Sequence, residues 1–111
     1  MKISEIAQTL GAKVLSQGTG SDAEITNVWA GDKMSDLLNA ASSKTLLVTH
    51  LNNQQLIRAA ELMDIPAICF LQGSVPDNEL IKSINKVGTV LISSPYGMFE
   101  TCGRLYQCLK S

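Results

Sequence analysis

The stretch that decides the fold is SDAEITNVWAGDKMSD, which covers residues 21–36. The run from Ile25 to Ala30 is rich in β-branched and apolar residues and predicts a strand, which Gly31 interrupts. The segment that follows, 32–41, carries apolar residues at helical spacing, and Asp32 is expected to cap this helix at its N-terminus. The stretch therefore predicts one strand followed by one helix.

The same unit recurs along the rest of the chain. Three further apolar runs predict buried strands, at 45–49, 65–71 and 87–92. A helix is expected after each of them, over 51–63, 76–86 and 96–109. Nearer the N-terminus, a short amphipathic helix over 3–10 precedes a short strand over 12–15.

Apolar strands that alternate with helices favour parallel pairing, with helices on both faces of the sheet. The sequence thus predicts one α/β domain over residues 1–111, a three-layer αβα arrangement with a mainly parallel sheet of about four main strands. Trp29 is expected to lie in the core on a central strand, and the alternative is that Trp29 and Tyr96 stack on a ligand. The last helix is expected to place most of its apolar residues on its inner side: Met98, Phe99, Cys102, Leu105, Tyr106 and Leu109.

Composition excludes several classes of protein. The chain of 111 residues is 45% hydrophobic and 17% charged, with a formal net charge of -1 and no run of Lys or Arg, so a nucleic-acid-binding surface is not expected. No window of about 18 apolar residues is present and the N-terminus lacks an apolar leader, so no membrane association is expected. Three cysteines without paired spacing fit a reducing compartment, and we expect a cytoplasmic protein.

The stretch around the first predicted strand resembles the DRTGG domain family. Asp22, Thr26 and Gly31 match the spacing of the motif that names this family, while Ala23 stands at the position of the Arg and Asn27 at that of the following Gly. Similar segments follow in the family's order and bring the resemblance to residues 2–109: 65–68, Gly73, 76–80, 86–91 and 94–101. The same fold occurs as the N-terminal domain of HPr kinase/phosphorylase.

Kinase activity is not expected from this chain. Phosphoryl transfer of that type uses a glycine-rich loop that ends in Gly-Lys-Ser or Gly-Lys-Thr, and none of the eight glycines is followed by Lys. Residues 18–23, GTGSDA, match the spacing of a dinucleotide-binding loop. They lead into a predicted strand where that motif requires a helix, so they predict a turn.

No metal site, cofactor or catalytic residue is expected either. The side chains that could bind a metal through nitrogen or sulfur are His50, Cys69, Cys102 and Cys108. Cys102 and Cys108 point about 120° apart on one predicted helix. The thiols are therefore interpreted as packed side chains. His50, the sole histidine, directly follows a predicted strand, and two interpretations stay open: a solvated loop residue or a ligand contact.

Ligands of open parallel sheets bind outside the carboxyl ends of the strands. The loops at those ends carry small, hydroxyl and amide groups, and three lead into helix N-termini with free N–H donors. We expect an anionic or nucleotide-like ligand to bind there. The candidate ligand-binding residues are Gly31, Asp32, Thr49, His50, Asn52, Asn53, Gly73, Ser93 and Ser94.

The leading functional prediction is a non-catalytic regulatory or ligand-sensing module. The resemblance implies regulatory usage as a homodimer, and the Met98/Phe99/Tyr106 region is a candidate surface for self-association. An alternative, also implied by the resemblance, is an accessory protein that interacts with iron–sulfur or hydrogenase-type redox enzymes. A minor alternative is a small enzyme with an unrecognised site.

Overall fold

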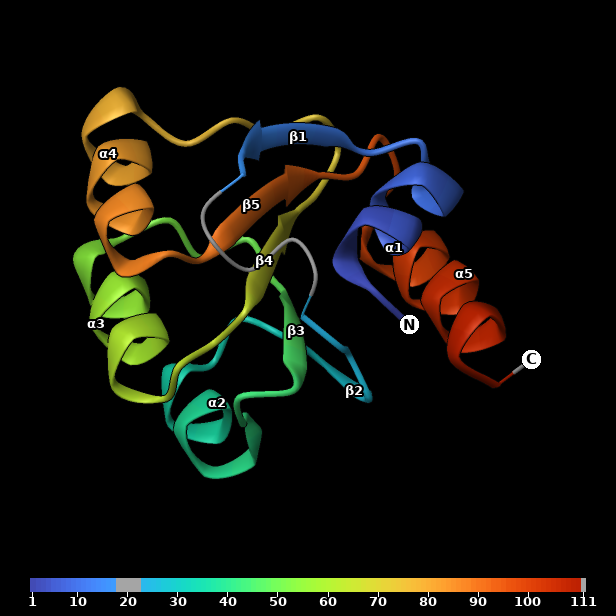
Figure 1. Cartoon of the computed structure of the whole chain (residues 1–111), viewed down its shortest axis with the longest axis horizontal. Helices are drawn as coiled ribbons and strands as arrows, with labels where there is room; N and C mark the ends of the chain where they lie inside the picture. Colours follow the sequence, from blue (N-terminus) through green and yellow to red (C-terminus); the bar gives the residue numbers. More distant parts are fainter. Residues whose placement is uncertain (18–22, 111) are drawn as a thin grey trace.

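A five-stranded sheet with the order β1-β5-β4-β3-β2 forms the centre of the molecule (Figure 1). The computed structural model describes residues 1–17 and 23–110; residues 18–22, which hold most of the predicted turn and Asp22 of the family motif, lie outside this range. The strands are β1 (Lys13–Ser16), β2 (Asn27–Ala30), β3 (Thr45–Val48), β4 (Ala67–Phe70) and β5 (Val90–Ser93).

Strands β2 to β5 are parallel, and β1 runs antiparallel to β5. All residues of β3, β4 and β5 are buried, as continuous apolar strands in a parallel sheet should be. The expected mainly parallel sheet is thus confirmed, with β1 as an additional edge strand.

Helices cover both faces of the sheet and complete the three predicted layers (Figure 1). Their bounds are α1 (Ile3–Leu10), α2 (Met34–Ala40), α3 (Gln54–Leu62), α4 (Asn78–Val87) and α5 (Met98–Lys110). Helices α1 and α5 pack on one face around a core that includes Ile6, Val48 and Leu105. The other three helices contribute to a second core on the opposite face.

Two helix ends show why the element bounds differ from the sequence prediction. Helix α4 is capped by Asp77, whose carboxylate accepts from the N–H of Leu80 at 2.9 Å, and it continues through Val87. Gly88 then ends the helix in the left-handed conformation, with φ at 89°. The prediction that a strand begins at Val87 was therefore wrong, and β5 begins at Val90.

Three side chains do not lie where the sequence predicted. Phe99 is 95% exposed and Tyr106 is 66% exposed, because helical spacing turns residues 98, 101 and 105 toward the sheet and rotates these two away. Trp29 lies on β2, an edge strand, and is only partly buried. Strand order in a sheet depends on tertiary packing, which the local pattern at Trp29 does not encode.

Candidate functional site

The carboxyl ends of the four parallel strands meet at one edge of the sheet, as the topology predicts. Backbone hydrogen bonds continue past the ends of the strands: Gly31 N–H donates to the Val48 carbonyl at 3.0 Å, and Ser94 N–H donates to the Phe70 carbonyl at 2.8 Å. Thr49 N–H likewise donates to the Cys69 carbonyl at 3.2 Å. The loops of this edge are therefore held in fixed positions by the sheet itself.

One cluster at this edge joins the ends of β2 and β3. Asp32 Oδ1 accepts from the Thr49 hydroxyl at 3.0 Å and from the His50 N–H at 2.7 Å. Its Oδ2 lies 3.0 Å from Nδ1 of the His50 ring. The prediction that Asp32 caps α2 was thus wrong: α2 begins at Met34, and the carboxylate turns toward the neighbouring strand, where three donors are available.

The pKa of Asp32 reflects these contacts. Burial alone raises the pKa of the carboxyl, but the hydrogen bonds from His50 and Thr49 favour the charged form and hold the pKa below its ordinary value. The group is therefore an anion at neutral pH. It makes the β2–β3 half of the edge unfavourable for a second anion.

The lowered pKa of Asp32 predicts how stability depends on pH. The stabilisation is present above the pKa of the unfolded chain and is lost as the pH falls through the folded-state pKa. In Asp32→Asn this acid-dependent loss of unfolding free energy should be smaller than in wild type between about pH 5 and pH 2. Urea titrations across this range, with Asp36→Asn as the control, measure it. Identical pH profiles for wild type and Asp32→Asn would contradict the assignment.

A second cluster joins the ends of β4 and β5 and the start of α5. Gly73 N–H donates to the Ser94 carbonyl at 2.8 Å, and the Ser93 hydroxyl donates to the Ser74 carbonyl at 2.8 Å. The buried hydroxyls of Ser94 and Thr101 lie 2.8 Å apart, which fixes the loop to the first turn of α5. The hydroxyl groups of Ser93, Ser94 and Thr101 are therefore hydrogen-bonded to other groups of the protein.

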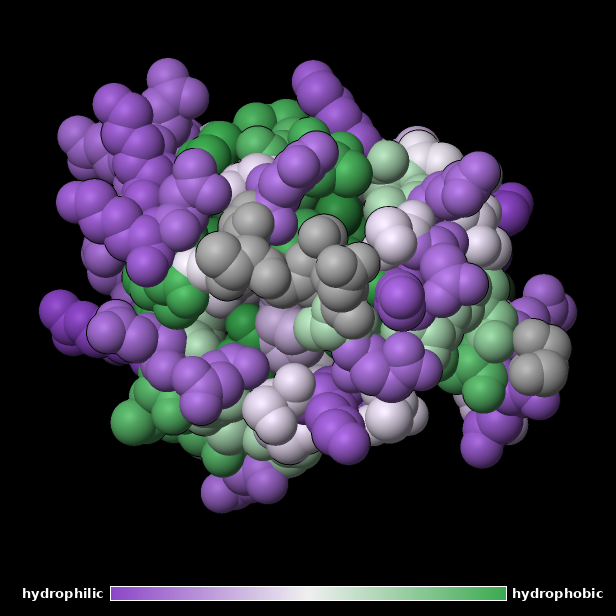
Figure 2. Space-filling view, viewed as in Figure 1, coloured by the Kyte–Doolittle hydropathy of each residue, from purple (hydrophilic) through white to green (hydrophobic). Residues whose placement is uncertain are grey.

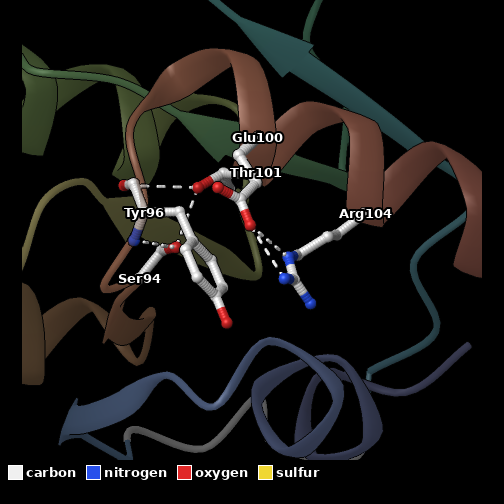
Figure 3. Close-up of polar contacts among 5 residues, drawn as sticks. All are labelled: Ser94, Tyr96, Glu100, Thr101 and Arg104. Carbon is white, nitrogen blue, oxygen red and sulfur yellow. Dashed lines mark hydrogen bonds and ion pairs between the residues drawn. The ribbon is translucent and has the colours of Figure 1, made fainter.

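Tyr96 and Arg104 form the exposed side of this second cluster (Figure 3). The Arg104 guanidinium lies 4.1 Å from the centroid of the Tyr96 ring, a cation–π arrangement. Its Nη2 also donates to Glu100 Oε2 at 2.8 Å, and Nε donates to the same oxygen at 3.0 Å. The guanidinium is about half exposed, so a ligand in solvent can reach it.

Seven of the nine ligand-binding residues predicted from the sequence fall into two groups, and the other two are asparagines at the start of α3. Gly31, Asp32, Thr49 and His50 lie together at β2–β3, and Gly73, Ser93 and Ser94 lie together at β4–β5. Asn53 caps α3, with its side chain accepting from Leu56 N–H at 3.0 Å, and Asn52 is exposed beside it.

Sequence reasoning placed Tyr96 in the loop after the last strand but missed Arg104 as part of this edge. The available signal was Glu100 and Arg104 four residues apart on the helix that follows the β5 loop, a spacing that places both on one helical face. Because that pair looks like an ordinary surface ion pair, the pattern alone did not indicate proximity to Tyr96.

The thiols and the histidine form no metal cluster in the described ranges 1–17 and 23–110, where no three His, Cys, Asp or Glu side chains gather in a suitable arrangement. Cys69 is fully buried, and burial raises the pKa of its thiol to about 12. Such a thiol is a poor nucleophile at neutral pH. Among the helices that the structure describes, none has the length and hydropathy needed to cross a bilayer.

Comparison with known proteins agrees with this architecture. The sequence model of the DRTGG domain family matches residues 5–108 of the chain. The chain belongs to the DRTGG domain family. The match covers both clusters of the strand-end edge and the whole sheet, so this DRTGG domain occupies almost the entire length given.

A solved structure shares the fold of this DRTGG domain. It is the crystal structure of the CBS and DRTGG domains of the regulatory region of Clostridium perfringens pyrophosphatase, in complex with the activator diadenosine tetraphosphate. The two structures superpose with a TM-score of 0.75 at 16% sequence identity. The match covers 96% of this chain and 46% of the other, so the DRTGG domain spans less than half of that regulatory region. No curated protein sequence matches the chain.

Proposed function

We propose that this DRTGG domain is a non-catalytic regulatory module that senses an anionic, nucleotide-like ligand and acts as a homodimer. The observation that carries the proposal is the fold match over 96% of the chain to a regulatory region that was crystallised with a dinucleotide polyphosphate activator. At 16% identity the match supports the fold, and the ligand class is inferred from the chemistry of the edge described above.

The β4–β5 half of the edge is the better place for the anion. Asp32, whose lowered pKa keeps it charged, occupies the other half and repels a phosphate group. At β4–β5 the first turn of α5 offers backbone N–H groups without partners inside the helix, and Arg104 supplies a cation next to the aromatic ring of Tyr96. A guanidinium recognises phosphate through paired hydrogen bonds, and an aromatic ring supports a nucleobase by stacking.

A phosphate at this position would compete with Glu100 for the Arg104 guanidinium. Both Arg104 nitrogens that bond to Glu100 donate to one oxygen, Oε2, so the existing pair is not the two-oxygen fork that binds most tightly. The pair is solvent-exposed and therefore contributes little to stability. A polyphosphate can displace it at small cost.

The hydroxyls and the histidine hold the loops in place, which supports a module without catalysis. Ser94 pairs with Thr101, and the Ser93 hydroxyl donates to a carbonyl. The His50 ring contacts Asp32 through Nδ1, and such a pair becomes catalytic only when the ring also reaches a serine or cysteine nucleophile. The groups that could act in hydrolysis thus have structural roles.

Replacing Arg104 tests the ligand site. Arg104→Gln is expected to weaken binding of ATP or diadenosine tetraphosphate about tenfold, from the loss of one charge-assisted interaction of about 1.5 kcal/mol. Isothermal titration calorimetry measures this change. The matched control is Arg58→Gln, which removes an exposed arginine from α3. Equal affinities for wild type and Arg104→Gln, or an equal loss in both variants, would contradict this location.

The homodimer is tested separately by sedimentation equilibrium of the unmodified chain across a wide range of concentrations. We expect a reversible monomer–dimer equilibrium. A single species at 11.9 kDa at the highest concentration would contradict the dimer and leave ligand sensing to be decided by the calorimetry.

A further inference from the structure

The two outer strands of the sheet, β1 and β2, differ in how their unpaired sides are protected against pairing with another chain. The β1 edge carries Lys13 and an irregular register between Val14 and Ser16, two features that discourage pairing with another chain. The β2 edge reads Asn-Val-Trp-Ala and pairs with β3 in a regular parallel register. It has no charge, proline or bulge within the strand. Such an edge is a template for an additional strand.

The backbone of β2 offers its hydrogen-bonding groups in a definite pattern. The N–H groups of Asn27 and Gly31 donate to carbonyls on the β3 side, at 3.4 and 3.0 Å. Because alternate residues of a strand point their backbone groups in opposite directions, the N–H and C=O of Val28 and Ala30 point outward from the sheet. The free edge therefore presents two donors and two acceptors, spaced two residues apart.

A cavity of about 370 Å³ lies beside this edge, between β2 and α5. It is lined from the sheet by Thr26, Val28 and Ala30, and from the helix by Cys102 and Tyr106 among others. The Tyr106 side chain is 66% exposed there. Figure 2 shows a further apolar region near the C-terminal end of α5, at the right of the view. An added strand would find both backbone partners and an apolar surface.

We propose that β2 pairs antiparallel with β2 of a second copy, across a two-fold axis at Trp29, to form a continuous ten-stranded sheet. This inference rests on the homodimer of the proposed function and assigns its interface. With the axis at Trp29, Val28 of each copy lies opposite Ala30 of the other. In each of these two pairs, the N–H of one residue donates to the C=O of the residue opposite, in both directions. The two Trp29 residues face one another in the closer, non-hydrogen-bonded position.

Two further observations favour a second copy as the partner. Exposed charged side chains flank β2: Glu24 before the strand, whose carboxylate also pairs with the Met1 amine at 2.7 Å, and Lys33 after it. An antiparallel dyad brings Lys33 of one copy to the same end as Glu24 of the other, twice. The same axis brings the two α5 helices together on one face of the sheet, which would cover Tyr106 and the neighbouring cavity.

Position-specific cross-linking tests the register. In a Cys102→Ser, Cys108→Ser background, Trp29→Cys should form a covalent dimer on mild oxidation, because the Cα atoms of a non-hydrogen-bonded pair are about 4.5 Å apart. Ala30→Cys is the matched control. Its two copies would be separated by roughly 8–9 Å, beyond the reach of a disulfide. Equal cross-linking in both variants, or none in a Trp29→Cys protein that sediments as a dimer, would overturn the register.

A second pair of variants keeps the test valid if Trp29→Cys does not fold. Ala30 is exposed, so Ala30→Pro removes an outward-facing N–H at an edge where proline is tolerated, while Ala30→Ser retains it. We expect Ala30→Pro to weaken the dimer at least tenfold in sedimentation and Ala30→Ser to leave it unchanged. A dimer unaffected by Ala30→Pro would place the interface elsewhere and leave the homodimer itself standing. A monomeric wild type would refute both.

Discussion

Phe70→Ala is expected to lower the free energy of unfolding by about 3–5 kcal/mol, the largest effect of any substitution considered. Phe70 is the last residue of β4, a strand in the interior of the sheet, and its side chain is 2% exposed. It belongs to the core on the face covered by α2, α3 and α4, together with Ile68 and Leu91. Removing the ring leaves a cavity that the rigid neighbouring strands cannot fill.

Urea unfolding followed by Trp29 fluorescence measures this loss as a lower midpoint at an unchanged m-value. All variants must be compared at one protein concentration, since a dimer's stability depends on it. Phe70→Leu, which keeps most of the apolar volume, is the control and should lose only about 1–2 kcal/mol. A loss below about 1 kcal/mol for Phe70→Ala would contradict the central position of this side chain.

Thr101→Val is expected to cost about 1–3 kcal/mol, although it keeps the shape of the side chain. Thr101 and Ser94 are both 0% exposed, and their hydroxyls share one hydrogen bond of 2.8 Å. Removing one hydroxyl leaves the other buried with fewer partners. Ser94 would keep only the bond from Tyr96 N–H, at 3.2 Å (Figure 3).

A double-mutant cycle isolates this pair. Ser94→Ala with Thr101→Val should cost less than the sum of the two single changes, with a coupling of about 0.5–3 kcal/mol. Thr9→Val, at an exposed position on α1, provides the control and should change stability by no more than about 0.5 kcal/mol. Additive single effects would mean that the two hydroxyls do not depend on each other. The pair is of functional interest because it orients the loop that carries Tyr96.

The layers and most strands of this fold were predictable because burial leaves a strong pattern. The runs at 45–49 and 65–71 are continuously apolar, which is the mark of strands covered on both faces, and β3 and β4 lie within them. The capping side chains of Asn53 and Asp77 likewise hydrogen-bond to the first turns of their helices. These strands and helix starts depend on residues that are close together in the sequence, so the sequence pattern was enough to indicate them.

The site was less predictable because its contacts join distant segments. Asp32 and His50 are 18 residues apart, and a carboxylate after a glycine reads locally as a helix cap. Only the pairing of β2 with β3 places it opposite the His50 N–H. In the same way, the proximity of Arg104 to Tyr96 depends on how the β5 loop folds back onto α5.

The most direct test of ligand sensing at the strand-end edge is an NMR titration of the chain with diadenosine tetraphosphate, ATP, AMP and inorganic phosphate. We expect saturable amide shifts concentrated at Gly73, Ser94 and the first turn of α5, larger for the polyphosphates, with weaker changes at Gly31 and Asn53. Absence of shifts across the whole panel, or saturable shifts confined to residues away from the strand-end edge, would contradict ligand sensing at this edge.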